Sequence, residues 1–437
     1  MHVTRPSVPS PLTHHSPEPP QSAPLTAPRA TALYVGALLG PSLLLLPGLA
    51  AQKAGAAALL AWATLLVLSA LLAFVFSRLG TSVGSRAGVA GYAAAGLGPV
   101  LGRATGWAFL LGVITGVPVV CLIGGQYVAA VVAEPAYGPA FAGALLVVVL
   151  FLRLFGANSG ARLQLLLMGL LLAFLVVAIC ASAGSARADN WRPFLSHGWS
   201  GVVGAAGHLM MAFVGWEAAA PLTARLSNAR RQLPRVILAA FGITSVVYLA
   251  LAAVLQAVLG AGAATVTPLA ALLEVAVGPA GPWLAAVIAL LLTLGVTNAY
   301  LASAAATAQH LMQGGRQTRQ TRQSGMSRVL LTVSVAAFGA LLLGLSAVGI
   351  VDLSLLVALP TAFFLLVYLV CCAAAGRLLA RGARMAAIVA TVTTGGLLVA
   401  AGTVSLLALV AVAVVTVVPG PRAGSRASSR SRAKRRA

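Results

Sequence analysis

The sequence predicts an all-α integral membrane protein with twelve transmembrane helices, and three observations lead there. Of its 437 residues, 60% are hydrophobic and only 8% are charged, whereas soluble proteins carry about 25% charged residues. Apolar runs long enough to cross a bilayer, which takes about 20 residues per helix, recur along the chain. Two of these runs, the first and the sixth, are interrupted by small or helix-breaking residues. So little charge cannot cover a water-facing surface, and the bilayer must therefore be the solvent.

The first 30 residues form a polar leader in front of the first span. This leader contains eight prolines, with Ser, Thr and His between them, and no apolar core. We therefore expect a disordered cytoplasmic segment and not a signal peptide. The apolar run that follows directly is then a retained span.

Twelve candidate spans follow the leader. They lie near residues 31–50, 55–77, 98–132, 139–156, 162–183, 201–222, 234–259, 282–311, 328–348, 351–374, 384–400 and 403–418. The third and the eighth exceed one bilayer crossing, which predicts tilt or extension into solvent. Pro118 is a candidate kink in the third. The last two are divided near Gly402, and merging them would leave eleven spans and move the C-terminus across the membrane.

The basic residues support an even number of spans. Alternating the loops between the two sides puts 25 of the 28 Lys and Arg on one side and leaves Lys53, Arg187 and Arg192 on the other. Because Lys and Arg concentrate in cytoplasmic loops, we expect a multi-pass protein of the plasma membrane with both termini in the cytoplasm. The first interpretation of the basic tail, residues 419–437, is that it orients the protein in the membrane. Binding of anionic lipid is the second.

The two halves of the chain resemble each other in outline. Spans one to five (31–183) and six to ten (201–374) each begin with an interrupted helix and have a very long third member. Since five is odd, the second set enters the membrane from the opposite face, which predicts a five-plus-five inverted repeat. The spans within 384–418 stand outside the repeat as accessory helices.

The interruption of the first span reads Gly36-Ala37-Leu38-Leu39-Gly40-Pro41-Ser42. Proline removes a backbone donor, and glycine lets the chain unwind and a ligand approach. The freed N–H groups of the second half-helix suit a carboxylate, and freed carbonyl groups suit an ammonium. Interrupted helices in corresponding positions of two halves indicate the substrate site of a secondary transporter. We predict substrate binding at Gly36, Gly40 and Ser42, with a close-packed small-residue face as the alternative.

The interruption of the sixth span reads Phe213-Val214-Gly215-Trp216-Glu217. Phe213 could gate a site, with ordinary packing as the alternative. Glu217 is the only acid well inside a predicted span, where a charge is costly, so a functional role is expected. It could hold a proton, bind a cation, or pair with an arginine and brace two helices. Glu217 and Trp216 are therefore coupling or gating candidates, and ordinary packing is the alternative for Trp216.

The eighth span carries a polar seam. Its members are Thr293, Thr297, Asn298, Ser303 and Thr307. Asn298 is the costliest of them in lipid and should face the bundle interior, so it is a further coupling or gating candidate. A polar contact between helices explains the seam nearly as well.

The sequence offers no pattern for an enzyme, a metal or a cofactor. The chain has six acidic residues, and its four cysteines lie in apolar stretches without zinc-type spacing to His. The arginines sit between apolar runs and not on one soluble face, which argues against a nucleic-acid partner. Proton coupling remains open, as do the coupling ion and the oligomeric state.

At these motifs the chain resembles the amino acid–polyamine–organocation transporters, the APC superfamily. It is most similar to the bacterial subgroup that exports methionine and branched-chain amino acids. The likeness covers about residues 31–418. It rests on Val35-Gly36-Ala37-Leu38-Leu39-Gly40 through Pro47, Gly88 to Tyr92, Gly98-Pro99, Thr105-Gly106-Trp107, Phe213 to Glu217, Asn228 and Pro234-Arg235.

This resemblance implies a LeuT-like inverted repeat that binds the substrate at unwound spans one and six. It implies substrate-binding residues at Gly36, Gly40, Ser42, Phe213 and Gly215, with Glu217 as a further candidate. It implies alternating-access transport of a small amino acid, with export of an apolar one favoured. A proton-driven importer or exchanger, and a non-transporting scaffold or sensor of the same fold, are the alternatives. Ser42 stands where the family usually has a second glycine, and Pro41 deletes one amide. The fifth span lacks the lysine that some proton-coupled relatives use.

Overall fold

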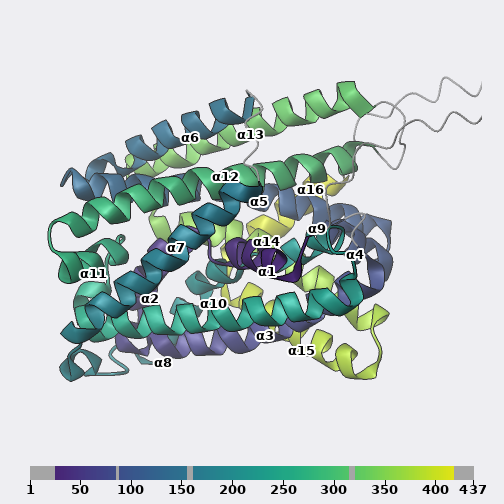
Figure 1. The fold of residues 1–437 in the computed structure, drawn as a ribbon. Helices are drawn as coiled ribbons and strands as arrows, with labels where there is room; N and C mark the ends of the chain where they lie inside the picture. The colour runs from purple at the N-terminus through teal and green to yellow at the C-terminus, as the bar shows by residue number, and fades with distance from the viewer. Residues whose placement is uncertain (1–24, 85–87, 155–160, 314–319, 418–437) are drawn as a thin grey trace, which may run out of the picture.

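The computed structural model describes residues 25–84, 88–154, 161–313 and 320–417, and within them the chain is helical and contains no strand (Figure 1). Its α-helices are Ala27–Leu38 (α1), Ser42–Ala54 (α2), Ala58–Val83 (α3), Gly88–Leu97 (α4), Pro99–Val131 (α5), Gly138–Leu154 (α6), Ala161–Ser182 (α7), Gly198–Leu209 (α8), Ala219–Thr223 (α9), Ala229–Leu259 (α10), Pro268–Val277 (α11), Ala280–Gln313 (α12), Gln320–Ala347 (α13), Leu353–Leu378 (α14), Arg381–Ala400 (α15) and Thr403–Val417 (α16). Short 3₁₀ turns lie at Gly55–Ala57, Pro135–Tyr137, Ala183–Ser185, Ala188–Trp191, Met210–Phe213, Trp216–Ala218 and Gly260–Ala263.

Ten stretches of the described chain are long and apolar enough to cross a membrane, which confirms the predicted all-α membrane class. They are Ser42–Val83, Pro99–Val131, Pro135–Leu154, Leu163–Ser185, Gly198–Thr223, Ala229–Ala263, Ala280–Leu311, Val329–Ala347, Leu353–Leu378 and Arg381–Ala400. The predicted count of twelve is not confirmed. α2 and α3 form one apolar stretch of 42 residues, and α16, with 15 residues, is short for a span of about 20.

Most predicted boundaries lie close to the helix ends. α5 and α12, with 33 and 34 residues, match the unusually long third and eighth spans. Pro118 lies inside α5 without ending it. Gly402 lies in the turn between α15 and α16, where the sequence divides the last two spans.

The first helix begins inside the predicted leader. α1 starts at Ala27, with Pro28 in its first turn, where the missing N–H of proline costs no helical hydrogen bond. Residues 1–24 of the predicted leader lie outside the described residues, and so does the basic tail, residues 419–437.

α5 forms the centre of the bundle. It is the most buried of the ten stretches and packs against α4, α6, α12, α13, α14 and α16. α6 and α13 lie side by side along one edge of the molecule (Figure 1). Among the ten stretches, those of these two helices and α15 have the smallest buried shares, which suits a lipid-facing position.

The two interrupted segments lie next to each other in the core. α1 packs against α10, α2 packs against α8, and the end of α1 contacts the second interruption. In front of α1, the N–H of Leu25 donates to the carbonyl oxygen of Arg225 at 2.8 Å, and Leu25 forms an isolated parallel bridge with Leu226. The chain before α1 is therefore tied to the loop after α9.

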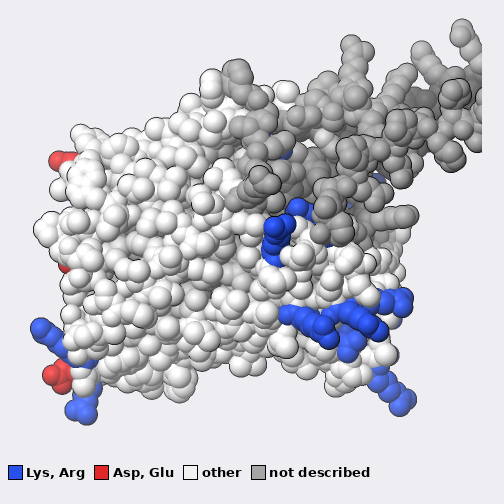
Figure 2. Space-filling model, in the orientation of Figure 1, with Lys and Arg blue, Asp and Glu red and all other residues white. Residues whose placement is uncertain are grey.

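Charged residues divide between the two ends of the bundle. On the face shown in Figure 2, acidic residues are seen only at one end, and a group of basic residues gathers at the other. Of the described acids apart from Glu217, three follow the ends of α5, α7 and α13, and one lies within α11; they are Glu134, Asp189, Asp352 and Glu274. We call the end with Arg78, Arg225, Arg230, Arg231, Arg235, Arg377, Arg381 and Arg384 the arginine-rich end.

Candidate functional site

The first interruption lies where the sequence predicts it. α1 ends at Leu38 and α2 begins at Ser42. Pro41 has no N–H to continue the helix. Short turns replace the helical hydrogen bonds: the N–H of Gly40 donates to Leu38 at 3.0 Å, and the N–H of Leu43 donates to Gly40 at 3.1 Å. Peptide groups of this segment are thereby released from the helical ladder.

The second interruption contains a residue that must be glycine. α8 ends at Leu209, and after a 3₁₀ turn the chain becomes extended at Val214. Gly215 has φ +138°, a conformation that L side chains rarely adopt. A Cβ atom on Gly215 would also lie 2.6 Å from the carbonyl oxygen of Ala37. The two interruptions therefore face each other at van der Waals distance.

Two tyrosine hydroxyls satisfy carbonyl groups at the interruptions. The hydroxyl of Tyr248 in α10 lies 2.8 Å from the carbonyl oxygen of Leu38 and 2.6 Å from that of Ala212, so the two segments share its single O–H donor. Tyr34 of α1 donates to the carbonyl oxygen of Trp216 at 3.0 Å. An unpaired backbone group inside a membrane costs several kcal/mol, so these tyrosines make the breaks tolerable.

Glu217 is buried and holds the second interruption together. Its Oε2 accepts a hydrogen bond from the N–H of Gly215 at 3.0 Å and from the hydroxyl of Tyr368 in α14 at 2.6 Å. The Tyr368 hydroxyl also accepts from the N–H of Gly215 at 3.0 Å. Across the described chain we find no ion pair to Glu217. Among the described residues, a tyrosine hydroxyl and a peptide N–H therefore hold the Glu217 carboxylate. The pairing with an arginine, one of the alternatives from the sequence, is not seen there.

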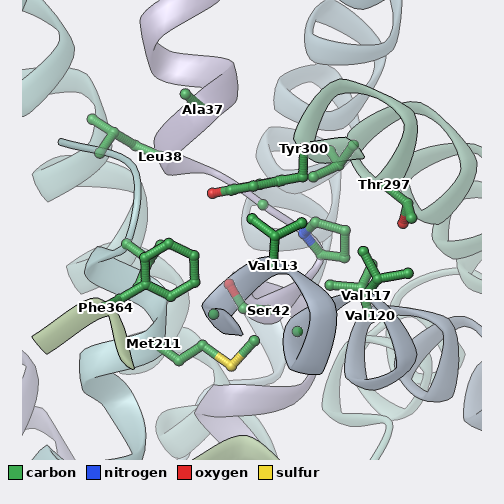
Figure 3. Close-up of a pocket in the computed structure, with 16 residues that line it drawn as sticks. Ala37, Leu38, Ser42, Val113, Val117, Val120, Met211, Thr297, Tyr300 and Phe364 are labelled. Atoms are coloured by element: carbon green, nitrogen blue, oxygen red, sulfur yellow. The ribbon is translucent and has the colours of Figure 1, made fainter. Parts of the chain in front are cut away.

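A cavity of about 50 Å³ lies beside the first interruption (Figure 3). At about 10–15 Å³ per water molecule it has room for roughly three to five waters. Its walls are Ala37, Leu38, Gly40, Pro41 and Ser42; Gly112, Val113, Gly116, Val117 and Val120 of α5; Met211 and Val214; Val296, Thr297 and Tyr300 of α12; and Phe364 of α14. Figure 3 shows Tyr300 lying across the cavity, with its hydroxyl toward the side on which Leu38 lies.

Two of the predicted binding residues line this cavity, and three do not. Gly40 and Ser42 are wall residues. Gly36 instead faces α7, where an added Cβ would lie 2.9 Å from the Met168 methyl carbon. Its position matches the close-packed alternative.

The second interruption contributes different residues from those predicted. Met211 and Val214 line the cavity, whereas Phe213 and Gly215 do not. Phe213 packs against Trp62 and Tyr248, with ring centroids 5.9 and 5.3 Å apart.

The coupling or gating candidates do not line the cavity either. The indole N–H of Trp216 donates to the hydroxyl of Ser69 in α3 at 3.1 Å, and its ring meets Tyr34 edge-on. Asn298 is partly buried and does not line the cavity, whereas its neighbours Thr297 and Tyr300 do. Glu217 does not line the cavity, and its carboxylate accepts from the N–H of Gly215, next to the wall residue Val214.

Sequence reasoning missed the wall formed by α5 and α14. Gly112 and Gly116, four residues apart in the third span, are the one signal that could have indicated it, because this spacing lines one face of a helix with small residues. The valines beside them and Phe364 carry no such signal. An apolar residue in an apolar span looks the same whether it faces lipid, core or cavity.

Comparison with known proteins agrees with this architecture. The family described as amino acid permease matches residues 25–429 of the chain. The chain belongs to the amino acid permease family. This match confirms the resemblance to the APC superfamily. The ten membrane-length stretches of the described chain agree with a transporter family of the membrane.

Curated relatives match the permease over about half of its length and about half of theirs. An uncharacterized amino acid permease of Bacillus subtilis, YecA, is 30% identical over 207 residues, 47% of this chain and 49% of the relative. The L-methionine/branched-chain amino acid exporter YjeH of Escherichia coli is 34% identical over 215 residues, 48% of this chain and 51% of the relative. The branched-chain amino acid permease BcaP of Bacillus subtilis is 22% identical over 250 residues, 52% and 53%.

Proposed function

We propose that this permease exports a small apolar amino acid by alternating access. The observation that carries the proposal is the cavity beside the first interruption. Its wall combines a break in the backbone with hydrophobic side chains and a few hydroxyl groups. Ligand sites typically join a mostly apolar lining with a small number of polar groups that fix orientation.

The polar end of the substrate would lie at Gly40, Pro41 and Ser42. Ser42 opens α2, and the positive dipole end of a helix N-terminus suits a carboxylate. Backbone carbonyl groups near the end of α1 and beside Val214 would accept from the ammonium. This assignment retains Gly40 and Ser42 from the sequence and adds Val214.

The side chain of the substrate would lie against α5, α12 and α14. Val113, Val117 and Phe364 supply apolar surface there, and none of the described residues that line the cavity carries a charge. A charged substrate side chain would be buried without a partner, which is costly. The wall therefore favours leucine, isoleucine, valine or methionine over arginine, lysine or a polyamine.

A relative named as an exporter supports export as the direction of transport, and the charge distribution supports an orientation in the membrane. YjeH, named as an exporter of methionine and branched-chain amino acids, supports export. The arginine-rich end would face the cytoplasm, with both termini there and the protein in the plasma membrane. The twelve-span, five-plus-five inverted repeat would supply the two half-bundles that rock around the site.

A proton-driven importer or exchanger is the second candidate. Glu217 favours it, because a buried carboxyl without a basic partner among the described residues can exchange a proton as the site opens and closes. Export and exchange share the same cavity and differ only in coupling.

Counterflow in proteoliposomes tests the proposal. Purified protein is reconstituted in vesicles loaded with unlabelled amino acid, and entry of labelled amino acids is followed with and without a pH gradient. We expect leucine, isoleucine, valine or methionine to exchange and charged amino acids not to. Preference for arginine, lysine or polyamines would overturn the apolar substrate class. No flux of any amino acid would support a scaffold or sensor instead.

A further inference from the structure

Three neighbouring helices share one surface pattern. α3 packs against both α10 and α15. α3 finishes at the arginine-rich end with the exposed Arg78, and the other two helices start there. α10 presents the exposed Arg231 and Arg235, and α15 presents the exposed Arg381 and Arg384.

On each helix the arginines continue into an exposed apolar stripe on the same side. The residues recur at intervals of one, two or three helical turns, which places them on one side of each helix. We call this surface the α3–α10–α15 face. Its residues are Val67, Phe74 and Arg78; Arg231, Arg235, Leu238 and Val246; and Arg381, Arg384, Met385, Ile388 and Val392.

No acid in the described chain balances these arginines. The described acids lie in the core or beyond the opposite helix ends, and no ion pair to the arginines of the face is found among described residues. The first turns of α10 and α15 contain no acidic residue either. An arginine there adds to the positive end of the helix dipole, an arrangement that an anion stabilises.

The apolar stripes decide which kind of anion fits. A soluble anion would need only the arginines, whereas the stripes run from them along the bundle and remain uncovered: Val67 is 67% exposed and Val392 is 69% exposed. The guanidinium of Arg78 lies 5.3 Å from the ring centroid of Phe74 in the stripe below it. On α3, the charge of Arg78 therefore lies directly beside the apolar stripe.

We infer that the α3–α10–α15 face binds an anionic phospholipid of the surrounding bilayer. The phosphate would contact Arg78, Arg235 and Arg384, and an acyl chain would lie along Phe74, Leu238 and their stripe neighbours. Juxtamembrane arginine clusters attract anionic headgroups, and each arginine near an anionic surface strengthens binding about fivefold.

Native mass spectrometry of the full chain tests this inference. The protein is purified from nanodiscs of phosphatidylcholine with and without phosphatidylglycerol, and the retained lipids are counted. We expect phosphatidylglycerol to stay bound to the wild type. The variant Arg78→Gln/Arg235→Gln/Arg384→Gln should bind it about a hundredfold more weakly, because three such contributions multiply.

A matched variant separates a site from general attraction. Arg29→Gln/Arg225→Gln/Arg377→Gln removes the same charge from exposed arginines that have no exposed apolar stripe behind them. It should retain phosphatidylglycerol like the wild type. Equal loss in both variants would overturn the site, because charge alone would then explain binding. Gel filtration and melting temperature identify any variant that fails to fold.

A third variant tests the apolar part of the face. Val67→Ser/Leu238→Ser/Val392→Ser keeps every arginine and should still lose lipid. Added inorganic phosphate should not displace phosphatidylglycerol from the wild type. Displacement by phosphate, or full retention in the serine variant, would show a site for soluble anions and overturn the inference.

Discussion

The hydroxyl of Tyr248 donates a hydrogen bond to the carbonyl oxygen of Leu38, 210 residues earlier in the chain, at 2.8 Å. The same hydroxyl lies 2.6 Å from the carbonyl oxygen of Ala212. One side chain of α10 therefore joins the two interrupted segments at the points where their helices end. Each interruption depends on a partner outside its own segment.

Tyr248→Phe tests this dependence. The substitution keeps the ring and removes the shared hydroxyl. The carbonyl oxygen of Leu38 keeps the N–H of Gly40, whereas the buried carbonyl oxygen of Ala212 loses its hydroxyl donor, which costs about 1–3 kcal/mol. We expect a lower melting temperature and slower counterflow. Tyr137→Phe is the control, because Tyr137 is exposed. Equal melting temperatures for the two variants would remove Tyr248 from this role.

Gly215→Ala should disrupt the second interruption. Its φ of +138° strains an L side chain by about 1–3 kcal/mol. The added methyl would also meet the carbonyl oxygen of Ala37. Gly207→Ala in α8 is a matched control, because open space surrounds that position. We expect counterflow and thermal stability to fall only in Gly215→Ala, and a normal Gly215→Ala protein would contradict the facing interruptions.

Glu217→Gln separates proton transfer from bracing. The amide oxygen can still accept from Gly215 and Tyr368, so we expect the variant to fold and to carry out counterflow. It cannot carry a proton, so flux driven by a pH gradient should be lost. Glu217→Ala removes the acceptor and should impair both. If Glu217→Gln responds to the gradient like the wild type, Glu217 has only a structural role.

Gly116→Val should change which amino acids are carried. A Cβ at residue 116 would lie 3.5 Å from the Cβ of Pro360, an ordinary contact, so the backbone need not move. The added methyl groups would fill part of the cavity. We expect counterflow of leucine and methionine to fall about tenfold or more relative to alanine. Gly143→Val in α6, where nothing lies near an added Cβ, is the control. A uniform loss for all amino acids would indicate damage and not selection.

Local chemistry predicts the interruptions well. Pro41 lacks a donor wherever it occurs, and Gly215 permits a backbone that other residues avoid. Both lie in breaks of the helices. Neighbouring glycines are harder to interpret. Gly36 and Gly40 look alike in the sequence, but one packs against Met168 and the other lines the cavity.

The sequence by itself determined the all-helical membrane class, the two interrupted segments and the buried position of Glu217, because hydropathy and backbone chemistry act within a few residues. Only the tertiary structure decided which side chains surround the cavity. Val117 and Val67 are both valines in apolar helices, yet one is 3% exposed and lines the cavity, and the other is 67% exposed. Helix rotation and packing separate them, and these arise from contacts between residues far apart in the chain.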